Sequence, residues 1–132
     1  MSVVSNGFVV TYIEHLKNIL NHILDSYQIL DEIEDKPGDL SKIEKEMLKI
    51  NGFIRVVSNK IDPDNIPVSD FKIIRIKFSQ YLENYSFEAE IKTMASLYSD
   101  DMSRVKNMRL KILEALKSKH MIDDARELMD DL

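Results

Sequence analysis

A continuous apolar stripe between Leu40 and Ile61 constrains the fold of this chain more than any other feature. Its apolar residues follow one another at gaps that alternate between three and four positions. Because an α-helix has about 3.6 residues per turn, these gaps place all of them on one face of a helix about six turns long. The stripe consists of Leu40, Ile43, Met47, Ile50, Ile54, Val57 and Ile61.

A second stripe precedes the first and predicts a helix over residues 8–34. We expect residues 1–7 to form a short frayed arm, with Ser5 or Asn6 capping the helix. The apolar face of this helix is wider than one neighbour could cover. Either the helix lies at the centre of the protein or a second copy covers part of it. The apolar residues outside its stripe are Val10, Leu24 and Ile29.

Two strong boundaries divide the chain. Residues 36–39 contain Pro and Gly, and so short a connection predicts an antiparallel hairpin between the first two helices. Ser41 and Glu44 have the spacing of a capping box at the start of the second helix. Two prolines within residues 62–67 end it.

Gly52 lies inside this helix, where it indicates close approach of another helix or, alternatively, a hinge or a ligand against the backbone.

The second half of the chain predicts further helices over residues 71–85, 87–98 and 102–119, and a short one over 123–132. The apolar stripe changes phase after Tyr85, which favours a break there over one long bent helix. The expected N-terminal caps of these helices are Ser69 or Asp70, then Ser86, the segment Ser99-Asp100-Asp101, and Asp123.

These patterns together predict an all-α fold in a single domain over residues 1–132. The chain is 44% hydrophobic and 31% charged, and three Gly and three Pro leave few places to turn. We expect a helical bundle of four main helices, a long N-terminal antiparallel hairpin plus C-terminal helices, with one or two short extra helices.

Composition excludes several classes of protein. The absence of Cys excludes disulfides, thiolate nucleophiles and cysteine-bound metals. A formal net charge of −5 argues against bulk coating of nucleic acid or of an anionic membrane. The N-terminus lacks the pattern of a signal peptide, and no apolar run is long enough to span a bilayer. The expected location is the cytoplasm, or the host cytoplasm if the chain is virus-encoded.

No catalytic, metal-binding or cofactor-binding constellation is found in the sequence, so we expect a protein that is not an enzyme. His15 and His22 are seven residues apart, about 10 Å along a helix, which is too far for one metal ion. No Glu is followed three residues later by a His, as helical di-metal sites require. His120 is expected to contact a helix C-terminus.

One helix is locally basic and supplies the candidate partner-binding residues. A contact with nucleic acid or with an acidic partner is one interpretation, and a solvated face of a bundle helix is the other. Lys72, Arg75 and Lys77 would extend the basic surface if the two helices lie side by side. The candidate residues are Arg104, Lys106, Arg109 and Lys111.

Residues 70–117, a helical stretch that ends in an Arg-rich helix, resemble the helical domain of archaeal GINS replication subunits. The matching positions are Arg104, Arg109, Lys111 and Ile112. The resemblance implies a subunit of an assembly that has no catalytic activity of its own.

The expected function is therefore a non-enzymatic protein-interaction or assembly module that binds a protein partner or associates with itself as a homo-oligomer. The alternative is a small nucleic-acid-associated regulator, or a GINS-like subunit of a replication complex, that uses the basic helix at residues 104–119.

Overall fold

The computed structural model describes the backbone of residues 2–132 and the side chains from Thr11 onward. This part of the chain is helical and contains no strand, so the prediction of an all-α protein is confirmed. The prediction for the side chain of Val10 lies outside the described residues. The elements are α1 (Ser2–Glu32), α2 (Asp39–Asn59), η1 (Pro63–Asn65), α3 (Phe71–Asn84), α4 (Glu88–Leu97), α5 (Met102–Lys117), η2 (Ser118–His120) and α6 (Met121–Asp131).

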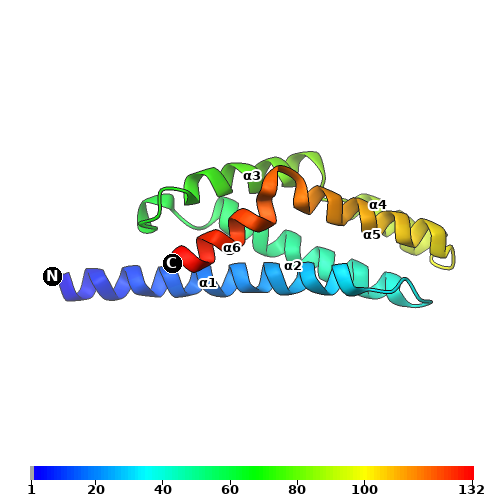
Figure 1. The fold of residues 1–132 in the computed structure, drawn as a ribbon, viewed down its shortest axis with the longest axis horizontal. Helices are drawn as coiled ribbons and strands as arrows, with labels where there is room; N and C mark the ends of the chain where they lie inside the picture. The colour runs from blue at the N-terminus through cyan, green and yellow to red at the C-terminus, as the bar shows by residue number, and fades with distance from the viewer. Residues whose placement is uncertain (1) are drawn as a thin grey trace.

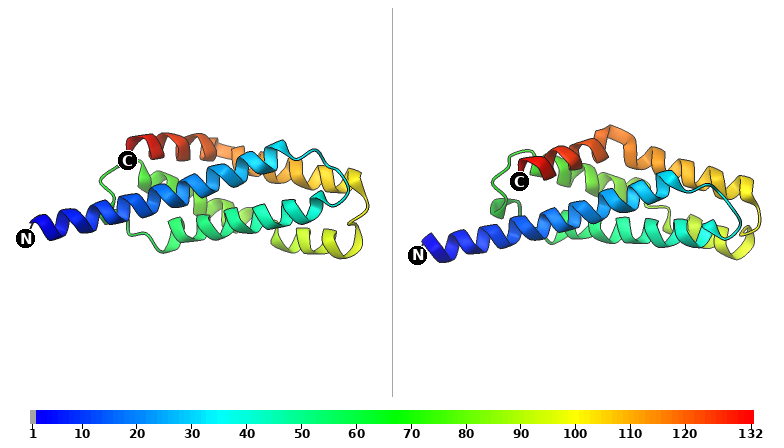
Figure 2. Two further views of the ribbon diagram at one scale, coloured as in Figure 1. Left: turned by 90° about the horizontal axis from the view of Figure 1, so that it is seen from below. Right: turned by 60° about the horizontal axis from the view of Figure 1, so that its bottom comes forward.

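Helices α1 and α2 pack side by side as the predicted antiparallel hairpin (Figure 1). Every residue of the stripe from Leu40 to Ile61 is at most 5% exposed, so the predicted burial of the stripe is confirmed. Helix α2 ends at Asn59, so Ile61 joins the core from beyond the helix. The predicted frayed arm is wrong, because α1 already begins at Ser2. Ser5 and Asn6 lie inside it, where isolated weak helix formers reduce stability only slightly. The N-terminal end of α1 extends beyond the other helices (Figure 2).

The remaining helices cover the hairpin. Helix α3 packs on α2, and α6 packs against both α1 and α3 (Figures 1 and 2). Helix α5 contacts α1, α2 and α6. Helix α1 itself contacts α2, α5 and α6, so its wide apolar face has three neighbours within the chain. Helix α4 lies at the periphery against α2 and α5, with Ile91 as its one fully buried side chain. No helix in the described part is long and apolar enough to cross a membrane.

Several predicted caps are wrong because left-handed backbone precedes the helix in their place. Helix α2 begins after Gly38, whose φ is +91°, and Asp39 accepts a hydrogen bond from Lys36 N at 2.9 Å, so Ser41 and Glu44 form no capping box. Helix α4 follows Phe87 at φ 62° rather than a Ser86 cap. The predicted break at Tyr85 is confirmed.

The remaining predicted caps, those of α3, α5 and α6, have different outcomes. The cap predicted within residues 99–101 is confirmed for α5 and is Asp101, which accepts a hydrogen bond from Arg104 N at 3.2 Å. Helix α6 begins at Met121, after left-handed backbone at His120, so Asp123 is not a cap. Asp70 precedes α3 without a hydrogen bond from its side chain to the helix.

Gly52 faces open space. Among the described residues, a Cβ atom built on Gly52 would meet no heavy atom within 4 Å outside its own helical backbone and chain neighbours. The predicted close approach of another helix at this position is therefore wrong. Nothing in the packing of α2 requires Gly there.

Candidate functional site

Arg109, one of the four candidate partner-binding residues, is buried in the structure. Its Nε and Nη2 atoms each donate to a carboxylate oxygen of Asp35 at 2.8 Å, and Nη1 donates to Leu30 O at 3.1 Å. The hydrogen bond to Asp35 raises the pKa of Arg109 above its ordinary value, while burial opposes that rise. Arg109 therefore ties the α1–α2 connection to α5 and does not present its guanidinium to solvent.

The other three candidates lie on the solvent side of α5. Lys106 and Lys111 are exposed. Arg104 is exposed but engaged, because its Nε lies 3.1 Å from Asp101 and its guanidinium lies 4.0 Å from the centre of the Tyr98 ring. We use the name α5 basic face for these three residues and the exposed Lys117. At 100° per residue, Arg104 and Lys111 lie on one side of the buried arc of α5, and Lys106 and Lys117 lie on the other.

The basic residues of α3 do not extend this face. The packing neighbours of α3 are α2 and α6. Arg75 donates to the carbonyl oxygens of Val57, at 3.2 Å, and of Ser58, where it satisfies the C-terminal end of α2. Lys77 pairs with Asp124 and donates to Lys119 O at 2.8 Å. Two of the three cations thus stabilise the fold.

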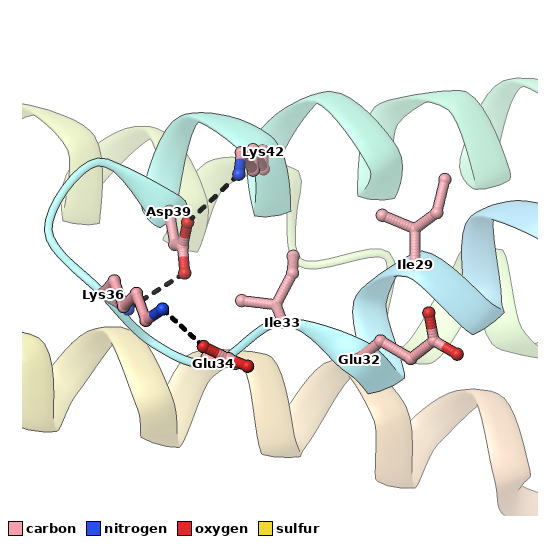
Figure 3. A pocket seen from close by; sticks show the side chains of 7 residues that line it. All are labelled: Ile29, Glu32, Ile33, Glu34, Lys36, Asp39 and Lys42. Carbon is pink, nitrogen blue, oxygen red and sulfur yellow. Dashed lines mark hydrogen bonds and ion pairs between the residues drawn. The ribbon is translucent and has the colours of Figure 1, made fainter.

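A hollow of about 310 Å³ lies at the α1–α2 connection (Figure 3). Its charged side chains already contact one another or a neighbour: Lys36 lies 2.6 Å from Glu34, Lys42 lies 3.6 Å from Asp39, and Glu32 accepts from Gln28 at 2.6 Å. Among the described residues no group of three or more His, Asp or Glu side chains is placed to hold a metal. The charged groups of this hollow hold the hairpin turn together.

Two of the three histidines lie beside identified side chains. His22 stacks on Phe53 of α2, with ring centres 4.8 Å apart and planes inclined by 4°. This contact explains why an imidazole lies at the edge of the α1–α2 interface. His120 is exposed, 3.8 Å from Asp123.

A buried polar network beside the α3–α4 corner was not predicted. The Tyr81 hydroxyl donates to Asn51 Oδ1 at 2.9 Å, and Asn51 Nδ2 donates to Ser86 O at 2.8 Å. Arg55 reaches Glu88 at 2.7 Å. Burial, helped by the charge of Glu88, raises the pKa of the Tyr81 phenol above its ordinary value. The one sequence signal for the network was Asn51, a polar residue next to the apolar stripe of α2.

The strongest candidate for a contact surface is on α3. Ile73 is 52% exposed and Ile76 is 59% exposed, and they lie one helical turn apart. Lys72 and Glu83, both exposed, lie on the same side of the helix. We call these four residues the α3 outer face. In Figure 1 this helix runs along the upper edge of the molecule.

The other large exposed apolar side chains do not form a comparable pair. Tyr85 and Tyr98 contact neighbouring aromatic or guanidinium groups. Leu97 is 69% exposed, at the last residue of the peripheral helix α4. Ile29, Leu48 and Leu110 are on three separate helices, α1, α2 and α5. Among the described residues, α3 alone presents two exposed isoleucines one turn apart.

Compared with models of known protein families, with curated proteins and with solved structures, the chain has no match.

Proposed function

We propose that this protein is a non-enzymatic interaction or assembly module of the cytoplasm whose contact surface is the α3 outer face. In this proposal the four longest helices, α1, α2, α3 and α5, act as one bundle that holds α3 in place. The observation that carries the proposal is that Ile73 and Ile76 are each more than 50% exposed to solvent. Exposing adjacent aliphatic side chains to water is unfavourable, and a partner that covers them on binding removes this free-energy cost.

Site-specific photo-cross-linking in the producing cells tests the proposal. A benzoylphenylalanine at Ile76 should give covalent adducts with a protein, and Ile73→Asp should reduce their yield. The matched control is the same probe at Leu110, which is 44% exposed on α5. An Ile76 probe that gives no more adduct than the Leu110 probe would contradict the proposal.

A second candidate function, a nucleic-acid-associated regulator, is favoured by the α5 basic face. Four exposed cations on one helix are accompanied there by one exposed acid, Glu114. Each phosphate that such a face neutralises adds about −0.9 to the slope of log affinity against log salt. Fluorescence anisotropy with a labelled duplex tests this, because Lys106→Glu with Lys111→Glu should abolish binding and leave the far-UV spectrum unchanged. Arg109 is left intact in this test because it supports the fold.

A further inference from the structure

The α3 outer face has a direction, because its charges differ at its two ends. At 100° per residue, Lys72, Ile76 and Glu83 lie within about 40° of one another around the helix. Lys72 and Glu83 are eleven positions apart, about 16 Å along the axis, with Ile76 between them. The face therefore carries a cation at the N-terminal end, an anion at the C-terminal end and an apolar middle at Ile76, next to Ser79.

The two end charges are not used inside the protein. Among residues 11–132, Arg75 and Lys77 make hydrogen bonds or ion pairs with neighbouring helices, whereas Lys72 and Glu83 take part in no ion pair. The intramolecular contacts of α3 thus leave out the charges at both ends of its outer face.

From this arrangement we propose that a second copy of the chain docks on the α3 outer face, so that two α3 helices pair antiparallel about a two-fold axis. The inference rests on the proposed interaction function and names the partner. A two-fold axis brings Lys72 of each copy opposite Glu83 of the other, which makes two identical ion pairs. A parallel arrangement in register would instead place Lys72 against Lys72 and Glu83 against Glu83.

The apolar middle of the face fits the same arrangement. With Lys72 opposite Glu83, the two Ile76 residues are offset by three positions, about 4.5 Å along the axis, which is close enough for contact between helices 8–10 Å apart. Ile73 then lies over the aliphatic part of Glu83 in the second copy. Water is displaced from both isoleucines of both copies.

Two hollows flank the α3 outer face, one on each side, and can receive side chains of the second copy. The one toward α6 has a volume of about 270 Å³ and is lined by Ile73, Ile74 and Leu128 together with four charged side chains, three of them acidic. The one toward α2 has a volume of about 510 Å³ and includes Ile76 and Pro63. Paired helices pack by placing the ridge of one into the grooves of the other, and both grooves are present here.

Charge reversal tests the two-fold arrangement directly. Lys72→Glu and Glu83→Lys should each weaken self-association about tenfold in sedimentation velocity, because each variant faces two repulsive pairs in place of two attractive ones. An equimolar mixture of the two variants should associate like the unmodified chain, because every pair across the axis is then again attractive. The matched control is a mixture of Lys111→Glu and Glu114→Lys, two variants on α5 that should each associate normally.

Replacement of the apolar middle gives an independent readout. Ile76→Glu should convert the dimer into a species of 15.4 kDa by light scattering, with an unchanged far-UV spectrum, whereas Leu110→Glu should not. A chain that is monomeric at every concentration, a dimer that survives Ile76→Glu, or a mixture that fails to restore association would each overturn the inference.

Photo-cross-linking separates failure of this inference from failure of the proposed function. Adducts of the Ile76 probe with a second copy of the chain support the inference. Adducts with a different protein alone overturn it and leave the interaction function in place. A probe that yields no specific adduct overturns both.

Discussion

Arg109 joins two parts of the chain that are 74 residues apart. Its side chain and that of Asp35 are 9% and 12% exposed, so the pair is largely shielded from water. The backbone of Asp35 has a φ of 60°, a conformation unusual outside Gly. Sequence periodicity could have separated Arg109 from its basic neighbours, because it falls on the same arc as Val105, Ile112 and Leu116, which are all buried. The prediction that Arg109 binds a partner did not use its position on this buried arc.

We expect Arg109→Ala to lower the free energy of unfolding by about 3 kcal/mol, because it leaves the Asp35 carboxylate shielded and unpaired. Urea unfolding followed by circular dichroism measures this change. Arg104→Ala, which removes an exposed ion pair, is the control and should cost less than about 1 kcal/mol. Equal losses in the two variants would contradict the role assigned to Arg109.

Tyr81 gives a prediction about alkaline pH. Burial raises the pKa of its phenol above the value of about 10 in the unfolded chain. A group with a raised pKa contributes stability that is fully present below its unfolded pKa and is lost as the pH rises above it. We therefore expect stability to fall above about pH 10, and Tyr81→Phe to make that fall shallower in urea unfolding across a pH series.

At neutral pH the same variant, Tyr81→Phe, should be less stable by about 1–3 kcal/mol, because the buried Asn51 Oδ1 loses its donor. Tyr85→Phe is the control, since the Tyr85 side chain is 45% exposed, and it should cost less. A Tyr81→Phe variant as stable as the parent chain would show that the network contributes little.

At the scale of the helices, periodicity identified most of what was observed. The stripe of residues 40–61 is buried as predicted, and that of α3 is buried up to Tyr81, whereas Tyr85, just beyond the helix, is exposed. The boundary at residues 62–67 lies where two prolines require it. The first residues of most helices could not be predicted from apolar periodicity. A cap prediction assumes extended backbone before the helix, whereas α2, α4 and α6 follow residues in left-handed backbone. Tertiary contacts such as Asn51 with Ser86 O, not local sequence, hold the α3–α4 corner.

Two glycines in the chain should respond in opposite directions to the same substitution. Gly52→Ala is expected to raise the free energy of unfolding by about 0.5–1 kcal/mol, because Ala is the better helix former and its Cβ meets nothing. Gly38→Ala should lower it by about 1 kcal/mol, because Gly38 has a φ of +91°. Thermal and urea unfolding of both variants measure the two changes, and a loss of stability in Gly52→Ala would point to an undetected contact.

For the molecule as a whole, the sequence indicated an all-helical chain but not which apolar residues remain outside. Helix α3 is apolar at Ile73 and Ile76 as well as along its buried stripe. Only the positions of α2 and α6 decide which side of α3 is covered. The α3 outer face was therefore not predicted, although both isoleucines fall outside the stripe.

The unequal covering of the helices predicts unequal local stability. Helix α4 has one buried side chain, whereas α2 is buried along its length. We expect the amides of α4 to exchange with solvent faster than those of α2, which should approach the protection set by global unfolding. Hydrogen exchange followed by mass spectrometry checks this. Protection in α4 equal to that in α2 would show that the polar network anchors α4 more firmly than its burial indicates.

The contact of α6 with α1 has a consequence for synthesis. The ribosome makes α6 roughly 90 residues after the end of α1. At the usual rate of elongation this corresponds to a delay on the order of 5–20 s. During that interval α2 can pair with α1, but the side of α1 that belongs to α6 stays open to water. We therefore expect the nascent hairpin to expose apolar surface that chaperones can bind, and slower translation to lengthen the time in which it can aggregate.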